Sequence, residues 1–344
     1  MTADTSPNPP PPDIDDVVPS RARARLIVVA AQLGQLVAVL VAVSVLTFLL
    51  LNALPGSVVD ARIGPLPNFS PEQRAELTET LSRQLGLDKP LWYQYAVWVK
   101  NAATGDFGLT YQGLETGQVI ADRLPATLQL SAVAVVLGVA LALVASILAY
   151  RTRFRPLRAA IQFSTTVLLV IPPFWLGLLL VIPLAALLNW LPSAGYVPAR
   201  DDPAQNLKFL LLPAVTLALP QMALFFRYLY AGLEDATSMD FVTAARARGL
   251  RERAVVYGHV LPNAVLPTIT VVGLVVGSMI SGLVIVESVF SWPGLGLLLV
   301  DSVRVKDYNT VAAIVLLTAV TYVVVAFVVD LLYQLLDPRT RRPA

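Results

Sequence analysis

The sequence predicts an all-α membrane protein with six transmembrane helices, on the strength of its composition and the length of its apolar runs. Of 344 residues, 56% are hydrophobic and only 14% are charged, whereas soluble domains carry about a quarter charged residues. A helix needs about 20 apolar residues to cross a membrane, and only helices or closed barrels satisfy the backbone in lipid. Six runs are long enough: 26–51, 125–149, 157–188, 208–231, 264–290 and 310–336.

The first run predicts a retained anchor, because it is far longer than the core of a secretory signal, about 7 to 15 residues. The proline-rich, acidic stretch before it has nothing to bury, so residues 1–25 are expected to be a disordered leader. With the N-terminus in the cytoplasm, 15 of the 25 Lys and Arg residues fall on the inner side, as the positive-inside rule requires. Both termini, including the tail 337–344, are therefore predicted to be cytoplasmic.

The segment 52–124 is then extracytoplasmic and too long to be a simple connection. Ser70, Pro71 and Gln73 form a capping-box arrangement that predicts the start of a helix, and Gly86 predicts its end. A second helix carries an aromatic cluster that we expect to anchor at the membrane interface: Trp92, Tyr93, Tyr95 and Trp98. The segment is predicted to cover the bundle or to contact another protein.

Within the predicted transmembrane core, residues 125–336, several prolines and one carboxylate are candidates for a structural or transport role. Pro172 and Pro173 should break the third run, and Pro213 and Pro220 lie on one side of the fourth, where each frees a backbone carbonyl. Packing against neighbours explains such kinks, while a role in a transport pathway stays open. Glu287 is an intramembrane carboxylate and therefore a functional candidate, although solvation or a capping hydrogen bond explains it about as well. Pro213, Pro220 and Glu287 are thus the candidates for a pathway.

Several kinds of chemistry are excluded. The chain has no cysteine and a single histidine, His259, so a thiol nucleophile, a Cys- or His-rich metal site and a Ser-His-Asp triad are not expected. A phosphate-cradling loop needs Gly-Lys before Ser or Thr, and no lysine here follows a glycine. The chain is therefore predicted to be a non-catalytic protein without cofactor or metal, and any ATP must be bound by another chain.

The inner loop 232–263 contains the stretch FVTAARARGLRERAVVYGHVLPNA, residues 241–264. Asp240 is the expected N-cap of a helix over 241–248, and Gly249 stands where a left-handed residue would end it. A second short helix is expected over about 250–261, before Pro262. The small residues on the first helix leave a surface that another protein could approach closely: Ala244, Ala245 and Ala247. The flanking Arg251 and Arg253 are explained equally well as topology signals that contact lipid phosphates.

This loop resembles the EAA loop of ABC-importer permeases, the coupling helix that inserts into the ATPase subunit. Thr243 and His259 depart from the general pattern, but both are similar to the dipeptide and oligopeptide branch. The stretches at 86–108, 123–131, 286–299 and 330–341 also resemble the B-type permease of that branch, and the resemblance covers nearly everything from residue 26 onward. Leu297 stands where a basic residue is common. The resemblance assigns coupling to these positions: Thr243, Ala244, Ala245, Gly249, His259, Leu261 and Pro262.

The resemblance implies a six-helix, type I permease subunit in the bacterial inner membrane. Its implied partners are a homologous second permease, two ATPase subunits, an extracytoplasmic solute-binding protein and the lipid, with no nucleic acid. The implied cargo is a dipeptide or oligopeptide, and nickel or another small solute of the same family is the alternative. An ion-coupled secondary carrier is the rival class, and the scarcity of intramembrane charges counts against it.

Overall fold

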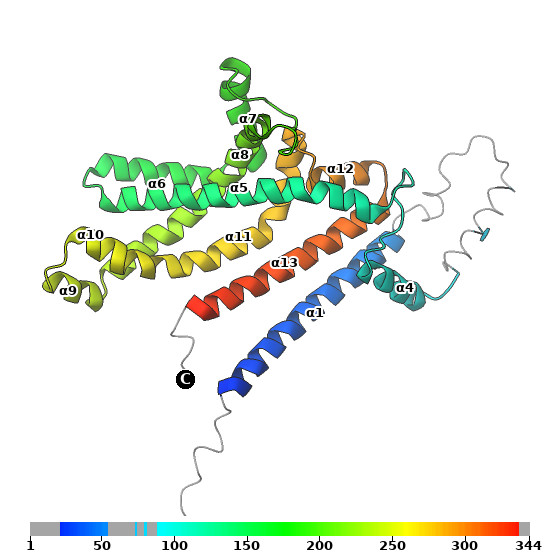
Figure 1. Ribbon diagram of the computed structural model, residues 1–344, viewed down its shortest axis with the longest axis horizontal. Helices are drawn as coiled ribbons and strands as arrows, with labels where there is room; N and C mark the ends of the chain where they lie inside the picture. Colours follow the sequence, from blue (N-terminus) through cyan, green and yellow to red (C-terminus); the bar gives the residue numbers. More distant parts are fainter. Residues whose placement is uncertain (1–20, 54–72, 74–78, 81–87, 337–344) are drawn as a thin grey trace, which may run out of the picture.

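The computed structural model describes residues 21–53, 73, 79–80 and 88–336, and these ranges are almost entirely helical (Figure 1). Within them the β pairing consists of one bridge, between Leu109 and Glu115. The all-α prediction is confirmed. The principal helices are α1 (Arg21–Ala53), α4 (Leu91–Ala103), α5 (Thr116–Arg151), α6 (Arg155–Val170), α7 (Pro173–Val181), the π-helix η2 (Ile182–Leu187), α8 (Pro203–Thr237), α9 (Asp240–Ala247), α10 (Glu252–Val255), the π-helix η3 (Val256–Val260), α11 (Leu261–Phe290), α12 (Leu295–Arg304) and α13 (Tyr308–Leu336).

Four stretches of helix in the described chain are long and apolar enough to cross a membrane, and two bent pairs bring the number to six. The first four are Thr116–Arg151, Pro203–Thr237, Glu252–Gly277 and Tyr308–Val328; the bent pairs are α6 with α7–η2, and the end of α11 with α12. The predicted first span lies within α1, whose residues Gly34–Leu50 form a shorter apolar helix. A multi-span helical membrane protein is therefore confirmed.

Two helices extend beyond the predicted apolar runs at their N-terminal ends. The leader was expected to reach residue 25, but α1 begins at Arg21, because alternating Arg and Ala are strong helix formers that extend the apolar run. The second run was expected to begin at Pro125, yet α5 begins at Thr116 and passes through that proline. A proline inside a helix removes one hydrogen bond, which a helix of 36 residues accommodates. The expected helix from Ser70 to Gly86 lies outside the described residues except for isolated positions.

Small residues let the central helices approach closely. The buried face of α5 repeats every four residues from Ala126 to Ser146 and consists mostly of small side chains, the pattern of tightly packed membrane helices. A Cβ on Gly138 would lie 3.3 Å from the Ala218 carbonyl oxygen of α8. Farther along α8, a Cβ on Gly232 would lie 2.9 Å from the Ala264 oxygen of α11. Helices α5, α8 and α11 therefore form the centre of the bundle.

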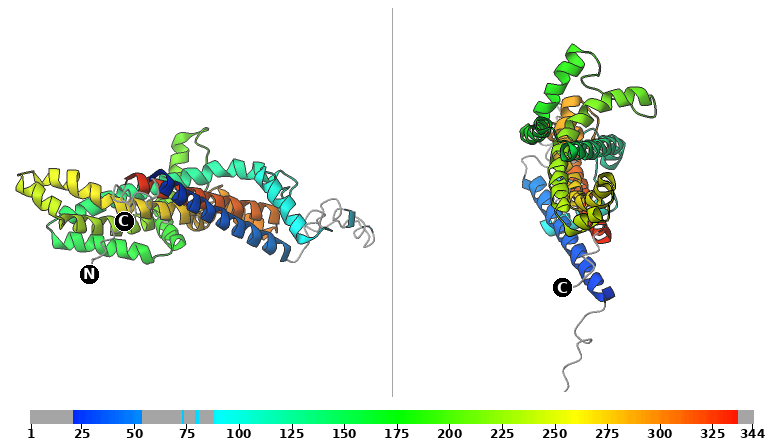
Figure 2. Two further views of the ribbon diagram at one scale, coloured as in Figure 1. Left: turned by 90° about the horizontal axis from the view of Figure 1, so that it is seen from below. Right: turned by 90° about the vertical axis from the view of Figure 1, so that its left-hand side faces the viewer.

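The predicted proline break after α6 is confirmed and is sharper than a kink. Pro172 has an extended backbone and Pro173 begins α7, so the helix axis turns by 113°. Helix α6 lies beside α5 (Figure 1), and α7 points in a different direction from α6 (Figures 1 and 2). A Cβ on Gly177 of α7 would lie 3.3 Å from side-chain atoms of Thr216 in α8 and Phe290 in α11, so α7 packs against these two helices. The predicted third run is a bent pair rather than a straight rod. A proline disfavours the helical conformation in the residue before it, and Ile171 and Pro172, which each precede a proline, are both extended.

The aromatic helix α4 packs against α1 through half of its predicted cluster. The ring centroids of Tyr95 and Trp98 lie 5.5 and 5.9 Å from that of Phe48, and the Tyr95 hydroxyl shares a 2.7 Å hydrogen bond with Ser44. Trp92, in contrast, is 70% exposed. In Figure 1 α4 and α12 lie toward one end of the bundle, and α9 and α10 lie at the opposite end.

Candidate functional site

Helix α9 follows α8 after a tight turn. The turn is closed by hydrogen bonds from Ser238 N to Asp235 O (3.1 Å) and from Met239 N to Ala236 O (3.3 Å). The prediction that Asp240 caps α9 was wrong, because the N-cap is Met239, which makes no side-chain capping bond. Asp240 is instead the first residue of the helix, where its negative charge interacts favourably with the positive end of the helix dipole.

The two faces of α9 have different surroundings. Val242 and Ala245 are buried in what we call the α9 cluster, whereas Thr243, Ala244 and Ala247 are exposed. Ala245, which was predicted to offer close approach to another protein, has its methyl group packed in this chain's own core. The α9 cluster consists of Leu229, Leu233, Ala236, Val242, Ala245, Val255, Val260 and Ala264. Residues of α8, α10, η3 and α11 complete this cluster, which therefore connects α9 to the bundle.

A left-handed glycine and an ion pair form the turn after α9. Gly249 has a φ of +78° and donates from its N–H to Arg246 O at 2.9 Å, as predicted for a residue that ends a helix. The Arg246 guanidinium contacts both carboxylate oxygens of Glu252, at 2.9 and 3.3 Å. This hydrogen-bonded pairing lowers the pKa of Glu252 and raises that of Arg246. Both side chains are largely exposed, so the pair contributes less than about 1 kcal/mol.

The second short helix does not end before Pro262, contrary to prediction. Helix α10 passes into the π-helix η3 and then without interruption into α11, which includes Pro262 in its first turn. The Leu261 N–H bonds to Val256 O, five residues back. A wider π turn here accommodates the missing N–H and the ring of a proline, which an ordinary α-helical turn tolerates poorly. His259 lies half-buried in η3.

Helix α5 contacts the end of α8 and the π-helix η3. The Tyr150 hydroxyl shares a 2.7 Å hydrogen bond with Thr237 Oγ1 at the end of α8. The next residue, Arg151, donates from Nη1 to the Tyr257 hydroxyl at 3.1 Å, and its guanidinium lies 5.9 Å from the centre of that ring. These contacts join α5 to the end of α8 and to η3, the segments on either side of α9 and α10.

At the other end of the bundle, Glu287 caps a helix to which it does not belong. The N-cap residue of α12, Gly294, has no side chain. Glu287 Oε2 instead accepts from Gly296 N at 2.7 Å and Leu297 N at 3.1 Å, the second and third N–H groups of α12, which an N-cap side chain usually satisfies. Glu287 is fully buried. Its carboxylate therefore fills a capping role in this structure.

Thr127 of α5 completes the cap. Its hydroxyl donates to Glu287 Oε1 at 2.8 Å and accepts from Leu295 N at 2.7 Å. Trp292 Nε1 donates to Ala126 O at 2.9 Å, so α5 is joined to the turn between α11 and α12 twice. An added Cβ on Gly296 would lie 2.5 Å from Val284 Cα, and glycine is therefore required there for α12 to approach α11.

Comparison with known proteins identifies the family of this chain. Residues 134–342 match the model of the binding-protein-dependent transport system inner membrane component. The chain belongs to this family. Residues 25–131 match the N-terminal model of such membrane components. The predicted ABC-importer permease in the bacterial inner membrane is thus confirmed, and permeases of this class work with ATPase and binding-protein partners.

Two curated relatives resemble this permease over most of its length. The oligopeptide transport system permease protein AppB of Bacillus subtilis (strain 168) is 34% identical over 305 residues, 88% of this chain and 95% of the relative. The glutathione transport system permease protein GsiC of Escherichia coli (strain K12) is 36% identical over 309 residues, 89% and 96% of the two chains. A crystal structure of an amino acid ABC transporter with histidines has a TM-score of 0.46 and 19% identity, and covers 64% of this chain and 94% of its own.

The predicted pathway residues of the permease lie in two different helices, α8 and α11. Pro213 is buried and Pro220 half-buried within α8, and neither they nor Glu287 line the cavity described below. Sequence reasoning missed Thr127, Tyr150 and Tyr257, because their partners lie far away in the chain.

Proposed function

We propose that this permease is the membrane subunit of an ATP-driven importer and that the exposed face of α9 binds an ATPase subunit. The observation that supports this most directly is the division of α9 into two faces. One face, with Thr243, Ala244 and Ala247, is free of this chain's own packing, while the other is held by Val242 and Ala245. A short helix of this kind can receive force from a partner and pass it to the bundle.

The complete importer would contain a homologous second permease, two ATPase subunits and an extracytoplasmic solute-binding protein. ATP hydrolysis would reside in the ATPase chains, and this permease would supply half of the translocation pathway. Closure of the ATPase pair would move α9, and the α9 cluster would move α8 and α11 with it. The contacts of Tyr150 and Arg151 would carry the same movement to α5. This sequence of contacts supports alternating access without any covalent chemistry in the permease.

The cargo that we propose is a dipeptide or oligopeptide. The two relatives above are permeases of oligopeptide and glutathione transport systems by name, and both cargoes are peptides. Mass spectrometry of what the partner binding protein carries when it is purified from its own cells tests this directly. Recovery of peptides is the expected result, and recovery of nickel or another non-peptide solute would contradict the cargo assignment while leaving the coupling role intact.

A substitution on the exposed face tests the coupling role. Ala244→Trp adds bulk to the proposed docking face, whereas Ala204→Trp adds the same bulk to an exposed position at the other end of α8. In purified transporter complexes, Ala244→Trp should abolish most of the ATPase stimulation by loaded binding protein, and Ala204→Trp should not. Wild-type stimulation in the Ala244→Trp complex would contradict docking at α9. Transport by the permease alone along an ion gradient would instead favour a secondary carrier.

A further inference from the structure

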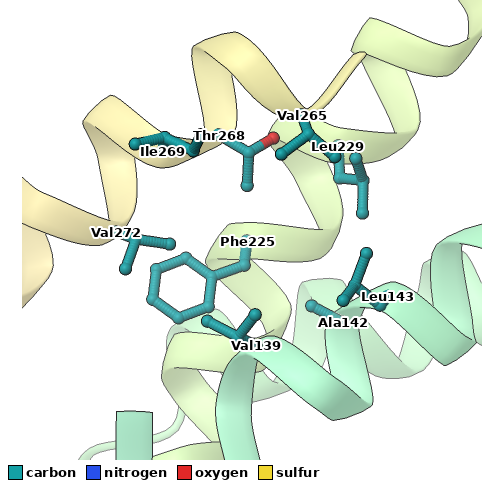
Figure 3. Close-up of a pocket in the computed structure, with 9 residues that line it drawn as sticks. All are labelled: Val139, Ala142, Leu143, Phe225, Leu229, Val265, Thr268, Ile269 and Val272. Atoms are coloured by element: carbon teal, nitrogen blue, oxygen red, sulfur yellow. The ribbon is translucent and has the colours of Figure 1, made fainter. Parts of the chain in front are cut away.

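A cavity of about 140 Å³ lies between α5, α8 and α11. Figure 3 shows its lining, in which side chains from all three helices point toward one another around an open centre. Four of the lining residues are buried and the other five are half-buried, so the cavity lies between the helices and opens in part toward the surface of the chain. The lining residues are Val139, Ala142, Leu143, Phe225, Leu229, Val265, Thr268, Ile269 and Val272.

The chemistry of the lining favours an apolar occupant. Eight of the nine lining residues are apolar, and the exception, Thr268, already donates its hydroxyl to Ala264 O at 3.3 Å. A buried water needs two to four polar partners, whereas an apolar cavity of about 150 Å³ stays dry and can bind benzene or xenon. The ring of Phe225 forms part of the wall and offers an aromatic surface to such a ligand.

The position of the cavity connects it to α9. Leu229 belongs to the α9 cluster, and Leu143 and Val265 pack against that cluster. Ala142 and Phe225 belong to a neighbouring cluster. The cavity therefore lies where the packing around α9 gives way to the packing deeper in the bundle. A change in the separation of α5, α8 and α11 would alter the volume of this space.

We propose that this cavity is a binding site for one small apolar molecule of about the size of benzene, and that occupancy inhibits coupling. A conformational cycle that changes the separation of these three helices would narrow the space between them, because all three contribute to its lining. A bound molecule holds the three helices at their present separation and opposes that narrowing. The binding site stands on the geometry alone, whereas the inhibition rests on the proposed function of α9.

Xenon is the probe for the binding site. Crystals of the purified transporter complex under xenon pressure should show one xenon atom surrounded by Phe225, Leu229 and Val272. Ala142→Leu places three extra carbons in the cavity and should remove that xenon. Val136→Leu, at a 69% exposed position of the same helix, should keep it. Thr268→Val preserves the shape without the hydroxyl and should keep it as well, so this variant tests the site even if Ala142→Leu fails to fold.

Absence of xenon from both the wild type and Thr268→Val would overturn the binding site. Benzene added to complexes in lipid nanodiscs tests the second half of the proposal. It should lower the ATPase stimulation by loaded binding protein by more than half in the wild type and in Val136→Leu, but not in Ala142→Leu. Equal effects in all three proteins would mean that benzene acts through the lipid, and would overturn inhibition at this site even where xenon binds.

Discussion

Replacing Glu287 by alanine should destabilise the permease strongly. The carboxylate accepts from Gly296 N and Leu297 N at 2.7 and 3.1 Å and from the Thr127 hydroxyl at 2.8 Å. Alanine would leave two N–H groups of α12 without an acceptor in a buried site. Each buried donor left unpaired costs about 1–3 kcal/mol, so the two together give a loss of about 2–6 kcal/mol.

Thermal unfolding of the detergent-purified permease measures this loss. At about 2 °C per kcal/mol for a large domain, a loss of about 2–6 kcal/mol should lower the midpoint by about 4–12 °C. Glu287→Gln should lose less, because an amide oxygen can still accept from both N–H groups while the amide nitrogen donates to Thr127 Oγ1. Asp122→Ala, at an exposed carboxylate of α5, is the control. A midpoint for Glu287→Ala no lower than that of Asp122→Ala would refute the capping argument.

Three further predictions concern the turn after α9, the ion pair beside it, and the orientation of the permease in the membrane. Gly249→Val should sharply reduce ATPase stimulation by loaded binding protein, because a φ of +78° costs most residues with a side chain about 1–2 kcal/mol. Gly249→Asn should reduce the stimulation less, since asparagine tolerates a positive φ and an added Cβ meets nothing within 4 Å. Equal loss in both variants would contradict the need for a positive φ at this position. A double-mutant cycle on Arg246 and Glu252 should give a coupling free energy of about 0.2–1 kcal/mol in thermal unfolding. Because Arg246 lowers the pKa of Glu252, this stabilisation is present above the ordinary glutamate pKa and is lost as the pH falls through the lowered pKa. A coupling free energy that persists below the lowered pKa would argue against the ion pair. For orientation, an impermeant thiol reagent on intact cells should label Ser193→Cys and not Ser238→Cys, and the reverse pattern would invert the predicted topology.

Features that depend on a few neighbouring residues could be predicted from the sequence. The apolar runs indicated a helical membrane protein, because the backbone in lipid leaves few alternatives. Pro172 and Pro173 predicted the break after α6, and Gly249 predicted a left-handed turn, since proline and glycine act on their own backbone angles. The same local pattern in residues 241–264 located α9 before any contact was known.

Only the tertiary structure decided which face of each helix is buried and which groups meet. Ala244 and Ala245 are the same residue type at adjacent positions, yet one is exposed and the other is packed in the α9 cluster. Glu287 could be explained equally by solvation, capping or transport until Thr127, 160 residues away, was seen to hold its carboxylate. Composition and periodicity report on a segment by itself, whereas burial and hydrogen-bond partners depend on how distant segments cross. For the same reason the cavity between α5, α8 and α11 left no trace in the sequence: three helices that pack closely at Gly138 and Gly232 need not fill the space between those crossings.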